Sequence, residues 1–175
     1  LLHLCAERGV GVSFMSEHGR FLARVSGPVS GNVLLRMSQM SAYEKPEVKG
    51  AIARSFVIGK VMNARNVLMR RIRDHGKTDD LNAATQHMGE VLLRLKDSDP
   101  DVVRIRGLEG EAAAVYFGVF NRMLVAQEKE FSILSRSRRP PMDPMNALLS
   151  YLYTLLVHDC RSALEGVGLD PQIGF

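Results

Sequence analysis

The chain has 175 residues, 46% of them hydrophobic and 24% charged, so it is long enough to bury a full core. No apolar run approaches membrane-spanning length, and the two cysteines, Cys5 and Cys160, lie far apart without a CxxC partner, which argues against a zinc site or a disulfide framework and fits a reducing cytoplasm. The net charge of +4 favours an acidic partner, nucleic acid before membrane.

The first thirty residues read as extended chain. Residues 9–15 alternate apolar with small or polar residues, residues 16–20 supply turn chemistry, and residues 21–25 run back, which predicts a hairpin. A lone hairpin is marginal in water. We therefore interpret residues 1–30 as the end of an N-terminal β domain, and the chain as a piece of a longer protein.

After residue 32 the hydrophobic period becomes helical, and residues 31–175 are interpreted as one helical domain. We expect a helix from Val33 to near Tyr43, and a longer one that begins around Pro46 and ends near His75. Further helices are expected over residues 79–95 and after Asp143-Pro144, the last ending at Gly166. This last helix is so apolar that we expect it to be central. The predicted fold class is mainly α, with a remnant hairpin.

The long helix that begins at Pro46 is strongly basic. Its expected inner face is Val48, Ile52, Ile58, Val61, Met62, Leu68, Met69 and Ile72. Its other positions carry Lys49, Arg54, Lys60, Arg65, Arg70, Arg71 and Arg73, against Glu47 and Asp74 alone. Long helices usually mix charge signs on the solvent face, so phosphate contact explains the excess slightly better than a solvated surface does.

Glu109 stands out among the acidic residues. We expect it in the first turn of a helix that follows residues 99–106, on the same face as Tyr116 and Phe120. Burial of an unpaired carboxylate is costly, which suggests a function for Glu109. The alternative is that an acid in the first turn only complements the helix dipole.

Four sequence patterns together resemble the CRISPR-associated adaptation endonucleases, the Cas-one integrase family. The first is Ala53-Arg54-x-Phe56-Val57-x-Gly59-Lys60-x-x-Asn63-x-Arg65-x-x-Leu68-x-Arg70. The second is Gly107-Leu108-Glu109-Gly110, followed by Tyr116-Phe117. The third is Arg138-Arg139-Pro140-Pro141-x-Asp143-Pro144-x-Asn146-Ala147-Leu148-Leu149-Ser150, and the fourth is Gly168-Leu169-Asp170-Pro171-x-x-Gly174-Phe175. They cover nearly the whole chain in the family's order, and the third looks most like subtype I-C.

The resemblance implies a β-rich N-terminal domain and an all-α catalytic domain, paired as a homodimer. It implies two such dimers around a small companion, the Cas-two subunit, and insertion of new spacer DNA into a CRISPR array by metal-dependent strand transfer on double-stranded and branched DNA. The family's metal ligands are a Glu, a His and an Asp. Glu109 matches the Glu, as catalytic residue and ligand of Mn²⁺ or Mg²⁺, while His158 does not match the His. The His and Asp are expected beyond Phe175, so we expect an incomplete metal site here.

The resemblance also favours DNA contact for several polar residues. Arg138 and Arg139 are expected to bind backbone phosphates, with a solvated loop as the alternative. Asn146, in the first turn of its helix, is equally compatible with phosphate contact and with local capping. Arg54, Lys60 and Arg70 are candidates too, although one helix cannot point all three at one groove. One competing hypothesis is a non-catalytic DNA-binding or scaffolding module, for which the basic helix suffices. Another is a helical interaction domain with no nucleic-acid partner, which salt-insensitive or absent DNA binding would support.

Overall fold

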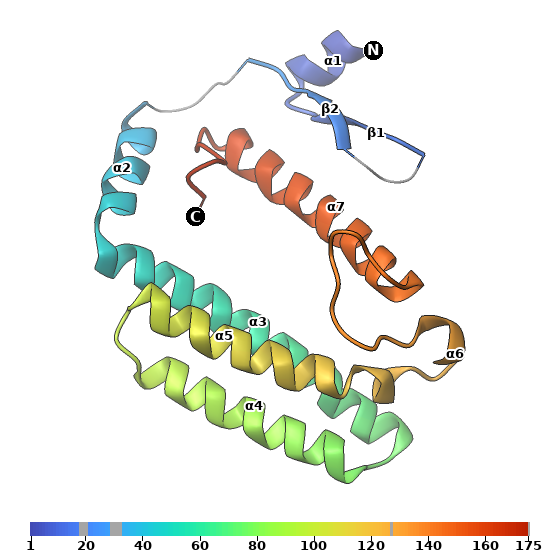
Figure 1. The fold of residues 1–175 in the computed structure, drawn as a ribbon. Helices are drawn as coiled ribbons and strands as arrows, with labels where there is room; N and C mark the ends of the chain where they lie inside the picture. Colours follow the sequence, from blue (N-terminus) through green and yellow to red (C-terminus); the bar gives the residue numbers. More distant parts are fainter. Residues whose placement is uncertain (18–20, 29–32, 127, 175) are drawn as a thin grey trace. The chain divides into compact units, whose positions relative to one another are not determined.

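A computed structural model describes residues 1–17, 21–28, 33–126 and 128–174 of the chain (Figure 1). Its residues group into two compact units, one formed by residues 1–43 and 146–175 and the other by residues 44–145. Most of the chain is helical, with one two-stranded sheet, so the predicted mainly-α fold with a hairpin is confirmed. The predicted domain boundary between residues 30 and 31 lies outside the described residues and stays a prediction.

The first unit begins with a short helix and the predicted hairpin. Strands β1 (Val12–Met15) and β2 (Phe21–Val25) pair antiparallel, with Val12 opposite Val25 and a register shift near Met15. The predicted turn tip at residues 18–20 lies outside the described residues. Extended backbone throughout residues 1–30 was a wrong expectation, because Leu2–Glu7 forms helix α1.

Two longer helices complete this unit, α2 (Val33–Glu44) and all but the first residues of α7 (Pro144–Gly166). Both follow the predicted ranges closely. The expectation that α7 would be central was wrong. Its buried residues are Asn146 and His158, whereas much of its apolar surface is exposed. The exposed apolar side chains of α7 are Leu148, Tyr151, Leu152, Tyr153, Leu156 and Val157.

The second unit is built on three helices, α3 (Pro46–His75), α4 (Asp79–Asp97) and α5 (Val102–Gly118), which pack on one another side by side (Figure 1). The short helices η1 (Phe120–Met123) and α6 (Glu128–Phe131) follow. One continuous apolar core joins the three long helices. Its buried members are Val61, Leu68, Leu81, Ala84, Met88, Val91, Leu95, Ile105, Leu108 and Ala112.

The core of this unit explains where the sequence pattern succeeds. Val61 and Leu68, seven residues apart, lie on the same side of α3 and are buried as predicted. Met62 and Met69 are each 45% exposed, so their placement on the inner face was wrong. Each lies one residue past a buried position, about 100° around the helix, and the stripe is narrower than predicted.

Helix α5 begins earlier than the sequence suggested. The side chain of Asp101 accepts hydrogen bonds from the backbone amides of Val103 and Arg104, which fixes the helix start at Val102. The predicted start near Glu109 was therefore wrong, and Arg106 belongs to the helix rather than to a segment leading into it. In the described residues no helix has the length and apolar character needed to cross a membrane.

Candidate functional site

Glu109 lies well inside α5, two turns after the helix start at Val102. The dipole of a helix acts within its first turn, and Asp101 already caps that turn. Complementing the dipole therefore does not account for Glu109, and the alternative that the sequence suggested was wrong. The side chain of Glu109 is 31% exposed, so solvent reaches part of it.

The partner of this carboxylate is Lys60 on the neighbouring helix α3. The ammonium of Lys60 donates to Oε1 of Glu109, and the Lys60 side chain is 53% exposed. The predicted metal ligand and a predicted DNA contact therefore form an ion pair across α3 and α5. The positive charge of Lys60 offsets the cost of holding a carboxylate at a half-buried position.

Among the described residues, Glu109 could supply one ligand to a divalent cation. A carboxylate oxygen suits Mg²⁺ and Mn²⁺, and a positive group already lies against Glu109. Within the described ranges, however, no group of three or more His, Cys, Asp or Glu side chains could hold a metal ion. His158 is 8% exposed on α7, as expected for a core histidine. Glu109 alone does not make a complete site.

Part of the basic face of α3 binds the protein itself. The guanidinium of Arg54 donates from Nη1 to the carbonyl oxygen of Ser98 at 2.6 Å. Nε of Arg65 donates to the carbonyl oxygen of Thr85 at 2.9 Å. These bonds tie α3 to α4 and its C-terminal end. Part of the positive charge read from the sequence as phosphate contact therefore has a structural use.

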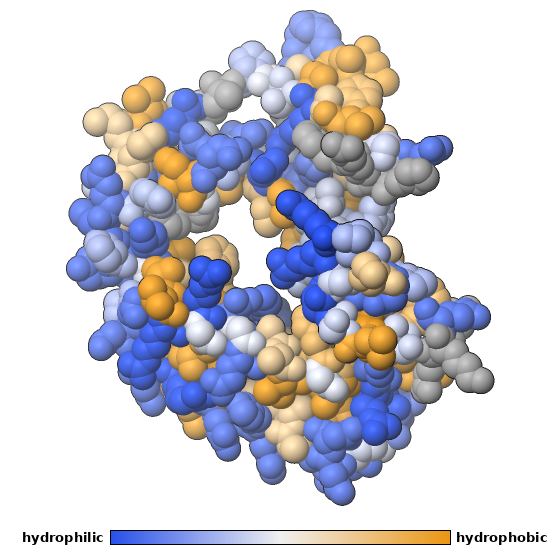
Figure 2. All heavy atoms as spheres, in the orientation of Figure 1, coloured by the Kyte–Doolittle hydropathy of each residue, from blue (hydrophilic) through white to orange (hydrophobic). Residues whose placement is uncertain are grey.

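The other predicted DNA contacts divide between exposed and buried positions. Arg70 is 75% exposed and only loosely paired with Asp74, at 3.7 Å. Arg138 and Arg139 are exposed in the segment before α7. The Asn146 side chain is fully buried, which favours its local alternative. The DNA role of these residues stays a prediction. Figure 2 shows hydrophilic side chains, in blue, extending from the helices of the second unit with apolar ones between them.

One charged cluster that the sequence did not predict joins α4 to α5. His87 and Arg94 on α4 both bind Oε1 of Glu111 on α5, with a His87 Nε2 to Oε1 distance of 2.6 Å. The hydrogen bond from Arg94, followed by that from His87, lowers the pKa of the Glu111 carboxyl. The spacing of seven residues places His87 and Arg94 on one helical face, a readable signal. Which acid they would meet on another helix could not be read from the pattern.

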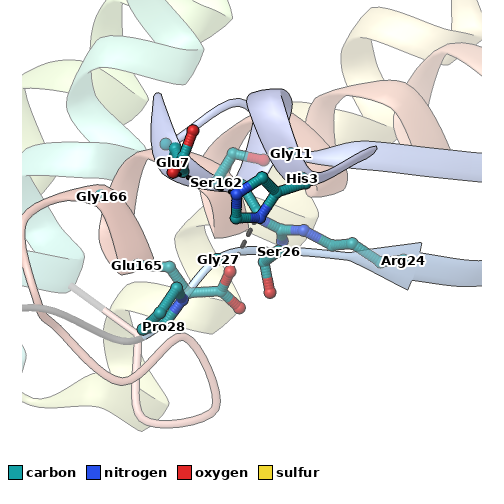
Figure 3. A pocket seen from close by; sticks show the side chains of 12 residues that line it. His3, Glu7, Gly11, Arg24, Ser26, Gly27, Pro28, Ser162, Glu165 and Gly166 are labelled. Atoms are coloured by element: carbon teal, nitrogen blue, oxygen red, sulfur yellow. Dashed lines mark ion pairs between the residues drawn. The ribbon is translucent and has the colours of Figure 1, made fainter. Parts of the chain in front are cut away.

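A pocket in the first unit was also missed. It has a volume of about 660 Å³ and lies between α1, the hairpin and the end of α7. Figure 3 shows Arg24 and Glu165 among its lining side chains, with His3 and Glu7 from α1. Nη2 of Arg24 pairs with Oε2 of Glu165 at 2.7 Å, which joins β2 to α7. Nothing in the sequence pattern brings these segments together.

Comparison with known proteins identifies the family. The family model described as CRISPR associated protein Cas1 matches residues 1–175. A CRISPR-associated endonuclease Cas1 from Rhodospirillum rubrum is 49% identical over 181 residues, covering 100% of this chain and 52% of the relative. A similar protein from Chlorobaculum tepidum is 48% identical, with 100% and 52% covered. The chain thus spans about half the length of the curated relatives it matches.

Solved structures agree in fold. A Cas1 protein from Thermotoga maritima has a TM-score of 0.74 at 23% identity, with 99% of this chain and 52% of that chain covered. A casposase bound to its integration product has a TM-score of 0.75 at 26% identity, with 97% and 46% covered. The assignment to subtype I-C stays a prediction, because none of these matches distinguishes subtypes. At the level of the family the matches agree along the full sequence, and this chain belongs to the Cas1 family.

Proposed function

We propose that this chain belongs to the catalytic region of a metal-dependent DNA endonuclease and integrase, which inserts new spacer DNA into a CRISPR array by strand transfer. The observation that carries the proposal is Glu109, a partly exposed acid in the middle of α5 that is paired with a cation and is not explained by helix capping. The relatives' description as endonucleases, and the likeness to a casposase bound to its integration product, support it.

Strand transfer is the attack of a DNA 3′-hydroxyl on a phosphodiester, which builds negative charge on the phosphoryl oxygens. A bound Mn²⁺ or Mg²⁺ ion would neutralise that charge and lower the pKa of the attacking hydroxyl. In this proposal Glu109 supplies one oxygen ligand, and the remaining ligands come from outside the described residues. The exposed guanidinium groups of Arg70, Arg138 and Arg139 hold the DNA backbone without reading its sequence.

The proposed partners follow from the structural neighbours. Two structures similar to this chain, at 26% and 28% identity, are described as complexes that contain Cas1 and Cas2. We propose that the whole protein likewise assembles with a Cas2 subunit. The family resemblance, rather than these neighbours, leads us to propose that it also pairs with a second copy of itself. This assembly would place two Glu109 sites on one DNA molecule, so that each could join one strand of the inserted segment.

The test is a strand-transfer assay on the full-length protein that contains this chain, with Mn²⁺, a DNA carrying free 3′-hydroxyls and a plasmid with a CRISPR array. We expect Glu109→Gln to lower joining by a factor of about 100 or more, as loss of charge stabilisation at a reacting centre does, while DNA binding persists. Glu90→Gln is the matched control, because Glu90 is an exposed acid on α4. Unchanged joining in Glu109→Gln would overturn the proposal.

A non-catalytic DNA-binding module is the second candidate, favoured by the excess of basic residues on α3. It predicts DNA binding that needs neither a divalent cation nor Glu109. If the wild-type protein binds DNA but neither joins nor cuts it with Mn²⁺ or Mg²⁺, the non-catalytic module becomes the better description.

A further inference from the structure

The ion pair between Lys60 and Glu109 joins two residues to which the sequence assigned different tasks. Lys60 was a candidate for phosphate contact and Glu109 for metal binding, yet the ammonium of one lies against the carboxylate of the other. Among the ion pairs of the described residues, Glu109 takes part in this one alone. The cation that neutralises Glu109 in this structure is therefore a side chain of the protein, the ammonium of Lys60.

We propose that Lys60 is a stand-in cation, which neutralises Glu109 in the metal-free protein and leaves when that carboxylate binds a divalent ion. The released ammonium is then available to a DNA phosphate at the same site. This inference rests on the proposed function, because it takes Glu109 as the metal ligand.

The exchange is favoured by the chemistry of both side chains. An ammonium and a divalent cation repel each other, so both cannot lie in contact with one carboxylate oxygen at little cost. The Lys60 ammonium ends a flexible four-carbon stem and its side chain is 53% exposed, so it can move away while losing little packing. An ion pair as exposed as this one also contributes little free energy, which makes it easy to replace.

A stand-in cation couples metal binding to DNA binding. While Lys60 holds Glu109 it competes with the metal, and it has no free charge to offer a phosphate. Once Lys60 leaves, its positive charge adds to the attraction for DNA. Metal and DNA should therefore strengthen each other's binding, and by thermodynamic linkage the factor must be the same in both directions.

The first experiment measures the Kd of Mn²⁺ for the full-length protein without DNA, by electron paramagnetic resonance of the free ion. We expect Lys60→Met to lower this Kd about two- to fivefold, because an exposed ion pair competes by no more than about that factor. Lys60→Arg keeps a cation and should stay near the wild-type value. Arg122→Met is the matched control, since Nε of Arg122 pairs with Asp80 at 2.7 Å on the surface of the same unit.

The outcomes separate this inference from the proposed function. Equal Mn²⁺ affinity in Lys60→Met and Arg122→Met would overturn the stand-in role, even where Glu109→Gln weakens Mn²⁺ binding as the proposed function requires. Unchanged Mn²⁺ binding in Glu109→Gln would instead overturn Glu109 as a ligand. In the Glu109→Gln background, Lys60→Met should no longer change the Kd.

The second experiment measures DNA affinity with a substrate whose 3′ ends lack a hydroxyl, so that no joining occurs. In EDTA, Lys60→Met leaves the charge of Glu109 uncompensated, so it should bind this DNA slightly more weakly than the wild-type protein does, by less than about twofold. With Mn²⁺, it should bind about two- to fivefold more weakly, the loss expected from one phosphate contact at moderate salt. An equal loss in both conditions would mean that Lys60 is a plain DNA contact and not a stand-in cation.

Discussion

The side-chain amide of Gln39 on α2 makes hydrogen bonds to both the backbone N–H and the backbone carbonyl of Asp170. Nε2 of Gln39 donates to the carbonyl oxygen of Asp170 at 2.9 Å, and Oε1 accepts from the Asp170 amide at 2.9 Å. Nε2 also donates to the carbonyl oxygen of Gly174 at 2.9 Å, and Nε of Arg36 donates to that of Gly168 at 2.8 Å. Two side chains of α2 thus fix the turn that follows α7.

Replacement of Gln39 by Ala should destabilise the first unit. Gln39 is 5% exposed, so its loss would leave partly buried backbone groups of the turn without these partners. We expect a loss of about 2–3 kcal/mol in the free energy of unfolding, measured by urea denaturation, with faster hydrogen exchange at the Asp170 amide. Gln86→Ala, at an exposed position of α4, is the control and should change stability little. Equal effects of the two variants would contradict a stabilising role for the hydrogen bonds of Gln39 to the turn.

Two glycines of α3 should respond oppositely to substitution by Ala. A Cβ on Gly50 would lie 1.6 Å from the carbonyl oxygen of Pro100, which a backbone atom cannot avoid by rotation. A Cβ on Gly59 would meet nothing within 4 Å. Gly50→Ala should therefore cost about 1–3 kcal/mol or more of stability, while Gly59→Ala should add about 0.5–1 kcal/mol through helix propensity. Thermal unfolding of both variants checks the signs.

The helices were largely predictable because their boundaries depend on local chemistry. Pro46 at the start of α3, Pro144 at the start of α7 and Gly166 at its end all act within one turn of the chain. The start of α5 was missed for a local reason too, since Asp101 was not recognised as its cap. That single error changed the reading of Glu109, which moved from a helix start to a helix middle.

The partners across helices were not predictable. The sequence indicated Lys60 and Glu109 as separate candidates, but periodicity carries no information about which faces of α3 and α5 meet. The same holds for Arg54, whose hydrogen bond to Ser98 depends on the packing of α3 against the end of α4. An excess of positive charge on a helix predicts that its basic side chains bind something. Only the packing of the helices shows which arginines bind the protein itself.

Truncation in the core should be far more costly than the same change at the surface of the same helix. Leu95 on α4 is fully buried in the core, whereas Leu93 is 62% exposed. We expect Leu95→Ala to lower the unfolding free energy by about 2–5 kcal/mol and Leu93→Ala by less than about 0.5 kcal/mol. Urea titration of both variants measures the difference. A similar cost at both positions would contradict the burial of Leu95 and the exposure of Leu93, and a larger cost at Leu93 would mean that α4 packs with its other face.

Removal of Arg138 and Arg139 should weaken DNA binding and make the DNA affinity less dependent on the salt concentration. If both exposed guanidinium groups contact phosphates, the double Ala variant should reduce the magnitude of the negative slope of log K for DNA binding against log salt by about 1.8. The double replacement of Lys77 and Lys96, both exposed, removes the same charge elsewhere and is the control. An unchanged slope in the arginine variant would mean that Arg138 and Arg139 make no phosphate contact and only form a solvated loop.

Acid should destabilise the second unit partly through Glu111. Its pKa is lowered from 4.5 chiefly by the hydrogen bond from Arg94, then by that from His87. A carboxyl whose folded pKa lies below its unfolded value stabilises the protein above the unfolded pKa, and that contribution is lost as the pH falls through the folded pKa. The stabilisation should therefore be complete above about pH 5 and decline below it.

The Glu111→Gln variant removes this titration while keeping the side chain's shape. It should be less stable than wild type at neutral pH, because Arg94 loses a charged partner, and the difference should shrink as the pH drops below 4.5. Urea midpoints from about pH 6 to about pH 3 measure it, with Glu90→Gln, at an exposed position of α4, as the control. A stability difference between wild type and Glu111→Gln that stays constant over this range would mean that the Arg94 and His87 contacts do not favour the ionised form of Glu111.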